Sequence, residues 1–296
     1  MKETANITRA YTYALAAVFG WSTVATAFKI TLGFLSVSEL LFYSALTSIA
    51  VLYPLHLKNG SNLSLPPWRN CLQIGLLVPS TYYLVLFQAY SILPAQHAQA
   101  LNYSWPLAMS ILAIFLLDQK ISVRKLSGLL VGFSGLVLIC LSRGSLASLS
   151  HSDGLGMILA IGSALFWGTY WILMLRSPYS PPSFLLGGFL GSLPFLSIAL
   201  IASGPVRIPP LEGLLGAAYI GVFEMGLTFF LWSKALQMAG RVASIANLAY
   251  FSPFLSLVWI YLFLGEKLEI LAIIGLIVLV SAVLISREPG GLVTEN

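Results

Sequence analysis

Charged residues are scarce in this chain: Asp, Glu, Lys and Arg make up 8% of its 296 residues, whereas soluble domains carry roughly a quarter. Hydrophobic residues make up 58%, more than one water-facing core of this size can bury. The composition therefore excludes an ordinary soluble domain and predicts that a lipid bilayer covers most of the surface.

Groups for covalent or metal chemistry are also few. The two cysteines, Cys71 and Cys140, lie inside apolar runs, which excludes a disulfide framework and predicts small buried side chains. No Walker-type phosphate loop is present, so ATP is not the direct energy source. The ten acidic residues are scattered, and the three histidines fall at the ends of apolar runs or in loops. We therefore expect no enzyme, no metal and no cofactor.

Ten apolar runs follow one another along the chain. Most are about 20 residues long, roughly 30 Å as a helix. The first is too long for the apolar part of a signal peptide and is interpreted as a retained helix. The fold class predicted is an all-α integral membrane protein of about ten transmembrane helices, with short loops, over residues 10–30, 37–57, 71–91, 95–117, 126–142, 154–175, 182–203, 211–233, 243–264 and 268–286.

The basic residues are distributed unequally between the two sides of the predicted bundle. With ten spans both termini share a side, and 11 of the 15 Lys and Arg residues fall there. The positive-inside rule then places both termini in the cytoplasm of a multi-pass cell (plasma) membrane protein, in a bacterium the inner membrane. This distribution explains the net charge of +5 without nucleic-acid binding.

The chain repeats itself at an offset of 147 residues. Several residue types recur at that spacing in distant spans, including the pairs Phe19/Phe166, Tyr103/Tyr250, Pro106/Pro253, Lys120/Lys267 and Gly128/Gly275. Each half, 1–147 and 148–296, then holds five spans. Because five is odd, the second half enters the membrane from the other side. Inverted repeats of this kind are typical of secondary transporters, whose site lies near the midplane.

These features resemble the drug/metabolite transporter superfamily, EamA type, over about residues 10–287. The segment Asn102-Tyr103-Ser104-Trp105-Pro106 and the pair Trp167-Gly168 resemble the aromatic amino-acid exporter branch. The resemblance implies a carrier that exports amino acids or moves another metabolite, with the first, third, fourth and sixth spans lining a central cavity.

Several large aromatic residues lie near the middle of their spans rather than in the interfacial belts. These are Trp21, Tyr82, Tyr83, Trp105 and Trp167. Such rings can stack on an apolar side chain or hold an ammonium group. The alternative is ordinary packing of the bundle.

Two short spacings add polar and aromatic partners. Asn102 lies three residues from Trp105 on one helical face and can contact a carboxylate or an amine. Trp167, Tyr170 and Trp171 are three and four apart and form one surface. That surface would face Trp105, unless Trp171 faces lipid.

Glu224 is the only carboxylate near the middle of a span. An ionised group there costs roughly 2.5–3.5 kcal/mol on insertion scales, and such residues are usually functional. We expect Glu224 to contact a substrate ammonium or to carry a coupling proton, the alternative being a protonated acid bonded to a neighbouring helix. The predicted substrate site comprises Trp21, Tyr82, Tyr83, Asn102, Tyr103, Trp105, Trp167, Tyr170, Trp171, Glu224 and Tyr250.

Polar residues at span ends are interpreted as structural. Interfacial caps and snorkelling lysines are predicted for Lys29, Asp118, Lys120, Lys234, Glu266 and Lys267, and an interfacial position for His97.

The function predicted is a secondary transporter that exports aromatic or neutral amino acids by alternating access. Its partners would be a small-molecule substrate and the lipid bilayer, and a monomer would suffice. The absence of Lys and Arg in mid-span argues against highly anionic cargo. An uptake or exchange carrier for another metabolite, such as S-adenosylmethionine or a sugar, stays open, as does a membrane enzyme.

Overall fold

A computed structural model describes residues 2–58, 64–116, 122–142, 150–205, 208–238 and 247–286. Every regular element within these ranges is a helix, and the helices form ten segments in the order of the ten apolar runs. The predicted boundary at residues 147/148 and the predicted caps Asp118 and Lys120 lie outside the described residues.

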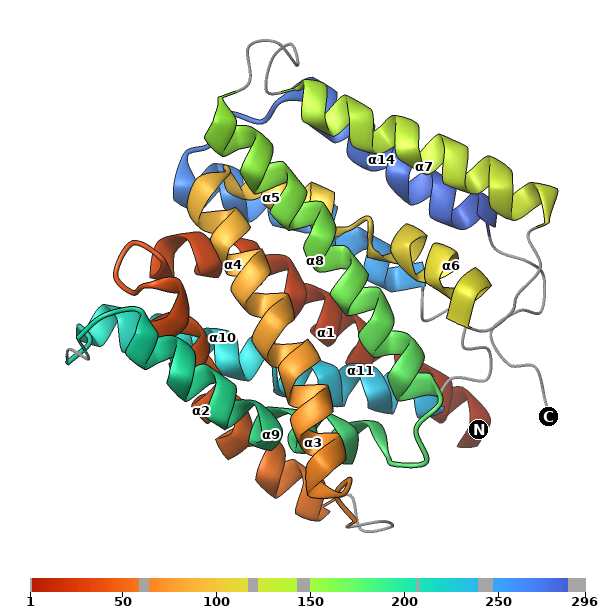
Figure 1. The fold of residues 1–296 in the computed structure, drawn as a ribbon. Coiled ribbons are helices and arrows are strands. Elements are labelled where there is room, and N and C mark those ends of the chain that lie inside the picture. Colours follow the sequence, from red (N-terminus) through yellow and green to blue (C-terminus); the bar gives the residue numbers. More distant parts are fainter. Residues whose placement is uncertain are drawn as a thin grey trace.

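The first half contains five segments (Figure 1). They are α1 (Lys2–Thr31), α2 (Val37–Lys58), a third made of α3 (Trp68–Gly75), η1 (Leu76–Thr81) and α4 (Tyr82–Ile92), a fourth made of α5 (Ala95–Asn102) and α6 (Trp105–Leu116), and α7 (Val123–Leu141).

The second half repeats this order. Its segments are α8 (His151–Leu175), α9 (Pro181–Ala202), an eighth made of α10 (Leu211–Phe223) and α11 (Leu227–Met238), a ninth made of η2 (Asn247–Phe251), α13 (Ser252–Trp259) and η3 (Ile260–Leu264), and α14 (Ile270–Ser286).

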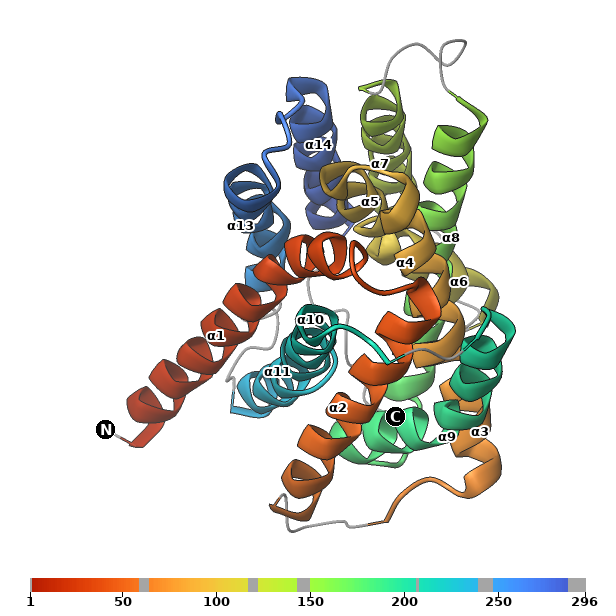
Figure 2. The same cartoon turned by 90° about the vertical axis from the view of Figure 1, so that its left-hand side faces the viewer.

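Length and composition make the chain an integral membrane protein. Six segments are long and apolar enough to cross a membrane, and three shorter apolar helices cover residues 126–141, 248–264 and 270–285. Below, the N-terminal side of the bundle means the end at which α1 begins, and the opposite side means the end at which α1 finishes (Figure 2).

The helix packing obeys a two-fold exchange of the halves. α3 packs on α9 as α10 packs on α2, α4 packs on α8 as α11 packs on α1, and α6 packs on α8 as α13 packs on α1. The pairs α2–α9 and α7–α14 are their own counterparts. This pattern is the one that an inverted repeat requires.

Glycines permit the closest of these contacts. A Cβ placed on Gly135 of α7 would lie 2.8 Å from the carbonyl oxygen of Gly275 on α14, and the reverse distance is 2.7 Å. A Cβ on Gly191 of α9 would overlap the backbone carbonyl of Cys71 on α3. Small residues drive helix association in lipid because they let backbones approach. Both cysteines are free, as expected, with Cys71 buried and Cys140 partly buried.

Four segments are broken part-way, and the breaks occur in corresponding spans of the two halves. The third segment leaves helical conformation at Val78 (φ −141°, ψ 123°) before Pro79, and the eighth turns at 224–226. The fourth and ninth segments restart at α6 and α13, each with a proline as its second residue, Pro106 and Pro253. Proline fits the first helical turn, where its missing N–H is not needed.

Side-chain hydroxyls replace the hydrogen bonds that these breaks remove. Ser48 Oγ of α2 donates to the carbonyl of Met225 at 2.9 Å, and Thr81 Oγ1 donates to that of Leu76 at 2.6 Å. Interrupted helices are tolerated at membrane depth only where protein or a cavity satisfies the freed groups. Broken segments in corresponding positions of two repeats therefore indicate where a site lies.

Candidate functional site

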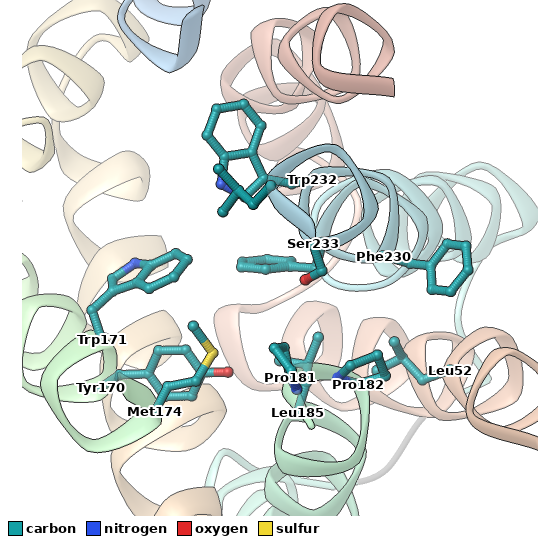
Figure 3. Close-up of a pocket in the computed structure, with 12 residues that line it drawn as sticks. Leu52, Tyr170, Trp171, Met174, Pro181, Pro182, Leu185, Phe230, Trp232 and Ser233 are labelled. Atoms are coloured by element: carbon teal, nitrogen blue, oxygen red, sulfur yellow. The ribbon is translucent and has the colours of Figure 1, made fainter. Parts of the chain in front are cut away.

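A partly open cavity of about 280 Å³ lies between α2, α8, α9 and α11, and Figure 3 shows the side chains that line it. Its walls are the last turns of α8, the length of α11 from Phe229 to Leu236, the first turns of α9 and Leu52 of α2. It is lined by Leu52, Tyr170, Trp171, Met174, Pro181, Pro182, Leu185, Phe229, Phe230, Trp232, Ser233 and Leu236.

Two polar atoms of this apolar lining have no hydrogen-bond partner within the described residues, although both are buried. They are Tyr170 Oη and Trp171 Nε1. Figure 3 shows the Tyr170 hydroxyl directed into the cavity beside Met174. Leaving a buried donor unsatisfied costs roughly 1–3 kcal/mol. The cavity thus favours an occupant that is mainly apolar but offers hydrogen-bonding groups.

A layer of stacked rings continues inward from the cavity. The Trp167 ring stacks on Tyr170 at a centroid distance of 5.3 Å and on Tyr82 of α4 at 4.8 Å. Trp105 of α6 stacks on Trp171 at 6.2 Å. Of the three residues predicted to form one surface, Trp171 is the one that contacts Trp105, and it also lines the cavity.

Trp21 of α1 supports the wall formed by α11. Its ring packs edge-on against Phe229 at 5.5 Å and lies 5.3 Å from Trp232. Trp21 thus contacts two cavity residues without lining the cavity itself.

Glu224 lies deeper, at the break between α10 and α11. Its residue is 8% exposed, and Tyr83 donates its hydroxyl proton to Oε1 at 3.1 Å. The Tyr83 ring is 4.6 Å from Tyr82. A carboxylate and its hydroxyl partner therefore stand behind the aromatic layer.

Asn102 ends α5 and links three helices. It accepts a long hydrogen bond from the Tyr82 hydroxyl at 3.4 Å and donates to Ser163 of α8 at 2.8 Å. Tyr103 and Tyr250, at the breaks of the fourth and ninth segments, are partly buried against the hydrophobic core. These three residues are not among those that line the cavity.

Of the eleven predicted residues, Tyr170 and Trp171 line the cavity, and Trp21, Tyr82, Trp105 and Trp167 support it. The sequence reasoning missed the walls from α9 and α11. A signal was available: at the 147-residue offset, Phe229 and Phe230 are the counterparts of Tyr82 and Tyr83.

On the opposite side of the bundle, His97 does not lie where the sequence analysis predicted. His97 is fully buried, with Nε2 2.8 Å from Ser142 Oγ and 3.3 Å from a Glu269 carboxylate oxygen. The interfacial position predicted for His97 was wrong, because the segment after η3 folds over the start of α5 and removes it from the surface.

The sequence profile of the EamA-like transporter family matches this chain twice, over residues 8–141 and 154–287. The chain belongs to the EamA-like transporter family. It is thus a membrane transporter of the drug/metabolite superfamily with the family domain present in two copies.

Curated relatives of this EamA-family chain include several uncharacterized transporters. It is 25% identical to the uncharacterized transporter YvbV of Bacillus subtilis strain 168, over 73% of this chain and 70% of YvbV. It is 24% identical to protein PecM of Dickeya dadantii, over 77% of each chain.

A chloroplastic WAT1-related protein of Arabidopsis thaliana is 28% identical over 64% of this chain, and the match spans 47% of that relative's length. A solved crystal structure of another protein superposes with a TM-score of 0.65 at 22% identity, covering 94% of this chain and 96% of that chain. At that identity the likeness shows the fold alone.

Proposed function

We propose that this EamA-family protein exports aromatic and other neutral amino acids by alternating access through the cavity between α8 and α11. The observation that carries the proposal is the cavity itself, with aromatic walls and two unpartnered polar atoms. Its volume of about 280 Å³ is just below the usual range of ligand pockets, which starts near 300 Å³. It suits a single small molecule.

The lining supports this substrate class group by group. Ring faces of Trp171, Phe229 and Trp232 offer an apolar surface to a side chain and attract an ammonium group. The Tyr170 hydroxyl and Trp171 Nε1–H can donate to a carboxylate. Among the residues that the structure describes, the cavity lining contains no Lys or Arg, which argues against a highly anionic substrate.

Glu224 supplies a coupling site in this proposal. A substrate ammonium and a proton compete for one carboxylate, since each neutralises the same charge. Binding and protonation then exclude each other, which is a minimal exchange mechanism. Glu224 stands behind the aromatic layer, so the exchange takes place after the substrate has passed the stack of Tyr82, Trp167 and Tyr170.

The remaining parts of the proposal concern orientation and assembly. With both termini in the cytoplasm of a cell membrane, the bacterial inner membrane in a bacterium, the cavity faces the cytoplasm and is placed to load cargo for export. All of the described lining residues come from one chain, which supports a monomer as the working unit. The protein acts as a carrier and leaves its cargo chemically unchanged.

Counterflow in proteoliposomes tests the function. Vesicles preloaded with unlabelled tryptophan, phenylalanine or leucine are expected to accumulate radiolabelled tryptophan transiently, whereas protein-free vesicles are not. Trp171→Ala should abolish the overshoot. Trp68→Ala should preserve it, because Trp68 is an exposed residue of α3 that is not part of the cavity lining.

The panel also includes S-adenosylmethionine, a sugar and a nucleoside, and mass spectrometry reads the recovered cargo. Exchange of one of these compounds with no exchange of any neutral amino acid would replace the proposed substrate class. Recovery of a chemically altered compound would indicate an enzyme instead.

A further inference from the structure

A lysine from α1 holds the end of α4 on the opposite side of the bundle. Lys29 Nζ donates to the carbonyl oxygens of Tyr90 and Leu93, each at 2.6 Å. Tyr90 is in the last turn of α4 and Leu93 follows it. The last carbonyls of a helix lack partners within it and carry its partial negative charge, so a cation there is stabilising. Lys29 was predicted to be a snorkelling anchor, but it is a helix-to-helix contact.

The second half holds the same turn from its other side. The Glu266 carboxylate accepts the backbone N–H groups of Ala95 at 2.8 Å and Gln96 at 3.3 Å, at the start of α5. An anion at a helix N-terminus complements the dipole there. The Gln96 side chain also donates to the carbonyl of Lys267 at 2.8 Å. The turn between α4 and α5 is thereby fixed between a cation of one repeat and an anion of the other.

The repeat assigns a counterpart to the lysine. At the 147-residue offset Lys29 corresponds to Arg176, which follows α8, and Tyr90 corresponds to Gln237 in the last turn of α11. Arg176 is exposed and makes no side-chain hydrogen bond or ion pair within the part of the chain that the structure describes. The cavity separates the ends of α8 and α11 on that side. One of the two equivalent contacts is therefore made, and the other is open.

The outer helix pair α2–α9 does not share this asymmetry. On the N-terminal side His56 Nδ1 lies 3.1 Å from Ser183 Oγ, and on the opposite side Ser203 Oγ donates to Ser38 Oγ at 2.7 Å. These two helices are thus joined at both ends. The two ends of the molecule therefore differ at the inner helices: α1 is bonded to the end of α4 on one side, whereas the ends of α8 and α11 are separated on the other.

We propose that Lys29 and Arg176 are alternating latches of the transport cycle. In the present state Lys29 holds the C-terminus of α4 and closes the opposite side. In the inverted state Lys29 releases α4, and Arg176 holds the C-terminus of α11 and closes the N-terminal side. The inference rests on the alternating access of the proposed function and is independent of the substrate.

Two reporter positions distinguish the states, because they are themselves repeat counterparts. Ser233 of α11 lines the present cavity. Leu86 of α4 corresponds to it at the same offset and is 2% exposed. If the halves exchange conformations, Leu86 lines a cavity on the opposite side while Ser233 becomes buried.

The experiment measures cysteine labelling in nanodiscs, where both sides meet solvent and no substrate is required. Ser233→Cys or Leu86→Cys is placed in a background in which Cys71 and Cys140 are serine, and a water-soluble maleimide is the probe. Lys29→Met should raise the labelling rate at 86 and lower it at 233, and Arg176→Met should do the reverse. A charged hydrogen bond is worth roughly 1.5–3 kcal/mol, so the ratio of the two rates should change about tenfold or more.

Matched variants separate a latch from general damage. Lys29→Arg keeps the cation and should restore the wild-type ratio, and Lys29→Met with Arg176→Met together should return it toward wild type. Lys267→Met and Arg69→Met remove a positive charge from the same sides and should change nothing. Equal effects at both reporters, or none, would overturn the proposal. If the labelling pattern is as expected but amino-acid counterflow fails, only the proposed substrate class is contradicted.

Discussion

The two ends of the bundle are built from equivalent helices but hold them differently. On the opposite side, α1 contacts the C-terminus of α4 through Lys29. On the N-terminal side, the equivalent ends of α8 and α11 are apart, and a cavity of about 280 Å³ lies between them. Under the alternating access proposed above, this asymmetry belongs to one conformational state, and exchange of the halves would give the same chain a second packing.

The direction of transport depends on which end faces the cytoplasm, and topology gives the largest, all-or-none outcome. Reporter fusions at Ser148 and Asn296 should report opposite sides of the membrane, with Asn296 in the cytoplasm, because 11 of 15 basic residues fall on that side. The measurement pairs alkaline phosphatase with green fluorescent protein at each position. Activity of the same reporter at both positions would contradict the inverted repeat and, with it, the equivalence of the two ends of the bundle.

Removing the ring at the centre of the aromatic layer should have the next largest effect. Trp167 contacts the cavity residues Tyr170 and Phe229 on one hand and Tyr82 on the other. Trp167→Ala should lower counterflow to background with expression near wild type, and Trp105→Ala should weaken it. The direct aromatic contacts alone are worth about 0.5–1.5 kcal/mol each.

Trp167→Phe serves as the control for ring loss, since it keeps an aromatic face and should retain measurable counterflow. Size-exclusion profiles show whether each variant is folded. If Trp167→Ala and Trp105→Ala are both folded and transport every accepted substrate at wild-type rates, these two residues have only a packing role.

The sequence predicted the fold well because its signals are strong in lipid. Ten apolar runs, the charge asymmetry and the matches at one offset are properties of whole segments, so they do not depend on side-chain geometry. The breaks in the segments were harder to predict. Three of them lie beside Pro79, Pro106 and Pro253, and Gly221 and Gly226 flank Glu224 at the fourth, but proline and glycine also occur in continuous membrane helices.

The site was predicted less completely, because depth in the membrane does not reveal the side on which a cavity is open. Tyr83 and Trp171 are both aromatic residues of the predicted site, yet Tyr83 is buried against Glu224 and Trp171 lines the cavity. Under the alternating access proposed above, the side on which the cavity is open depends on the conformational state. The internal repeat supplies the information that depth does not. Phe229 and Phe230 occupy in this state the positions that Tyr82 and Tyr83 would occupy in the other.

Glu224→Gln tests whether transport is coupled to protons and should have an effect of intermediate size. Glutamine still accepts the hydrogen bond from Tyr83 but cannot ionise. We expect proton-driven accumulation of labelled tryptophan to disappear and the remaining exchange to be independent of pH between pH 5 and 8. The measurement is uptake across a pH series with and without an imposed gradient. Tyr83→Phe, which removes only the hydrogen bond, should keep the pH response. A wild-type profile in Glu224→Gln would make the carboxylate structural.

Tyr170→Phe should have the smallest and most discriminating effect. The Tyr170 hydroxyl is buried at the cavity without a partner, so its removal loses no hydrogen bond within the described protein. If this hydroxyl donates to the substrate, the half-saturating concentration of tryptophan should rise about three- to tenfold, as for the loss of one hydrogen bond of roughly 0.5–1.5 kcal/mol.

The melting temperature of Tyr170→Phe should not fall, even though its affinity for tryptophan does. Deleting an unsatisfied buried hydroxyl is expected to leave the melting temperature unchanged or raise it. Tyr82→Phe is the matched control, because its hydroxyl has a protein partner in Asn102. Its loss should lower the melting temperature while leaving the half-saturating concentration nearer to wild type. The opposite assignment, with affinity lost in Tyr82→Phe and unchanged in Tyr170→Phe, would move the substrate from the open cavity to the inner face of the aromatic layer.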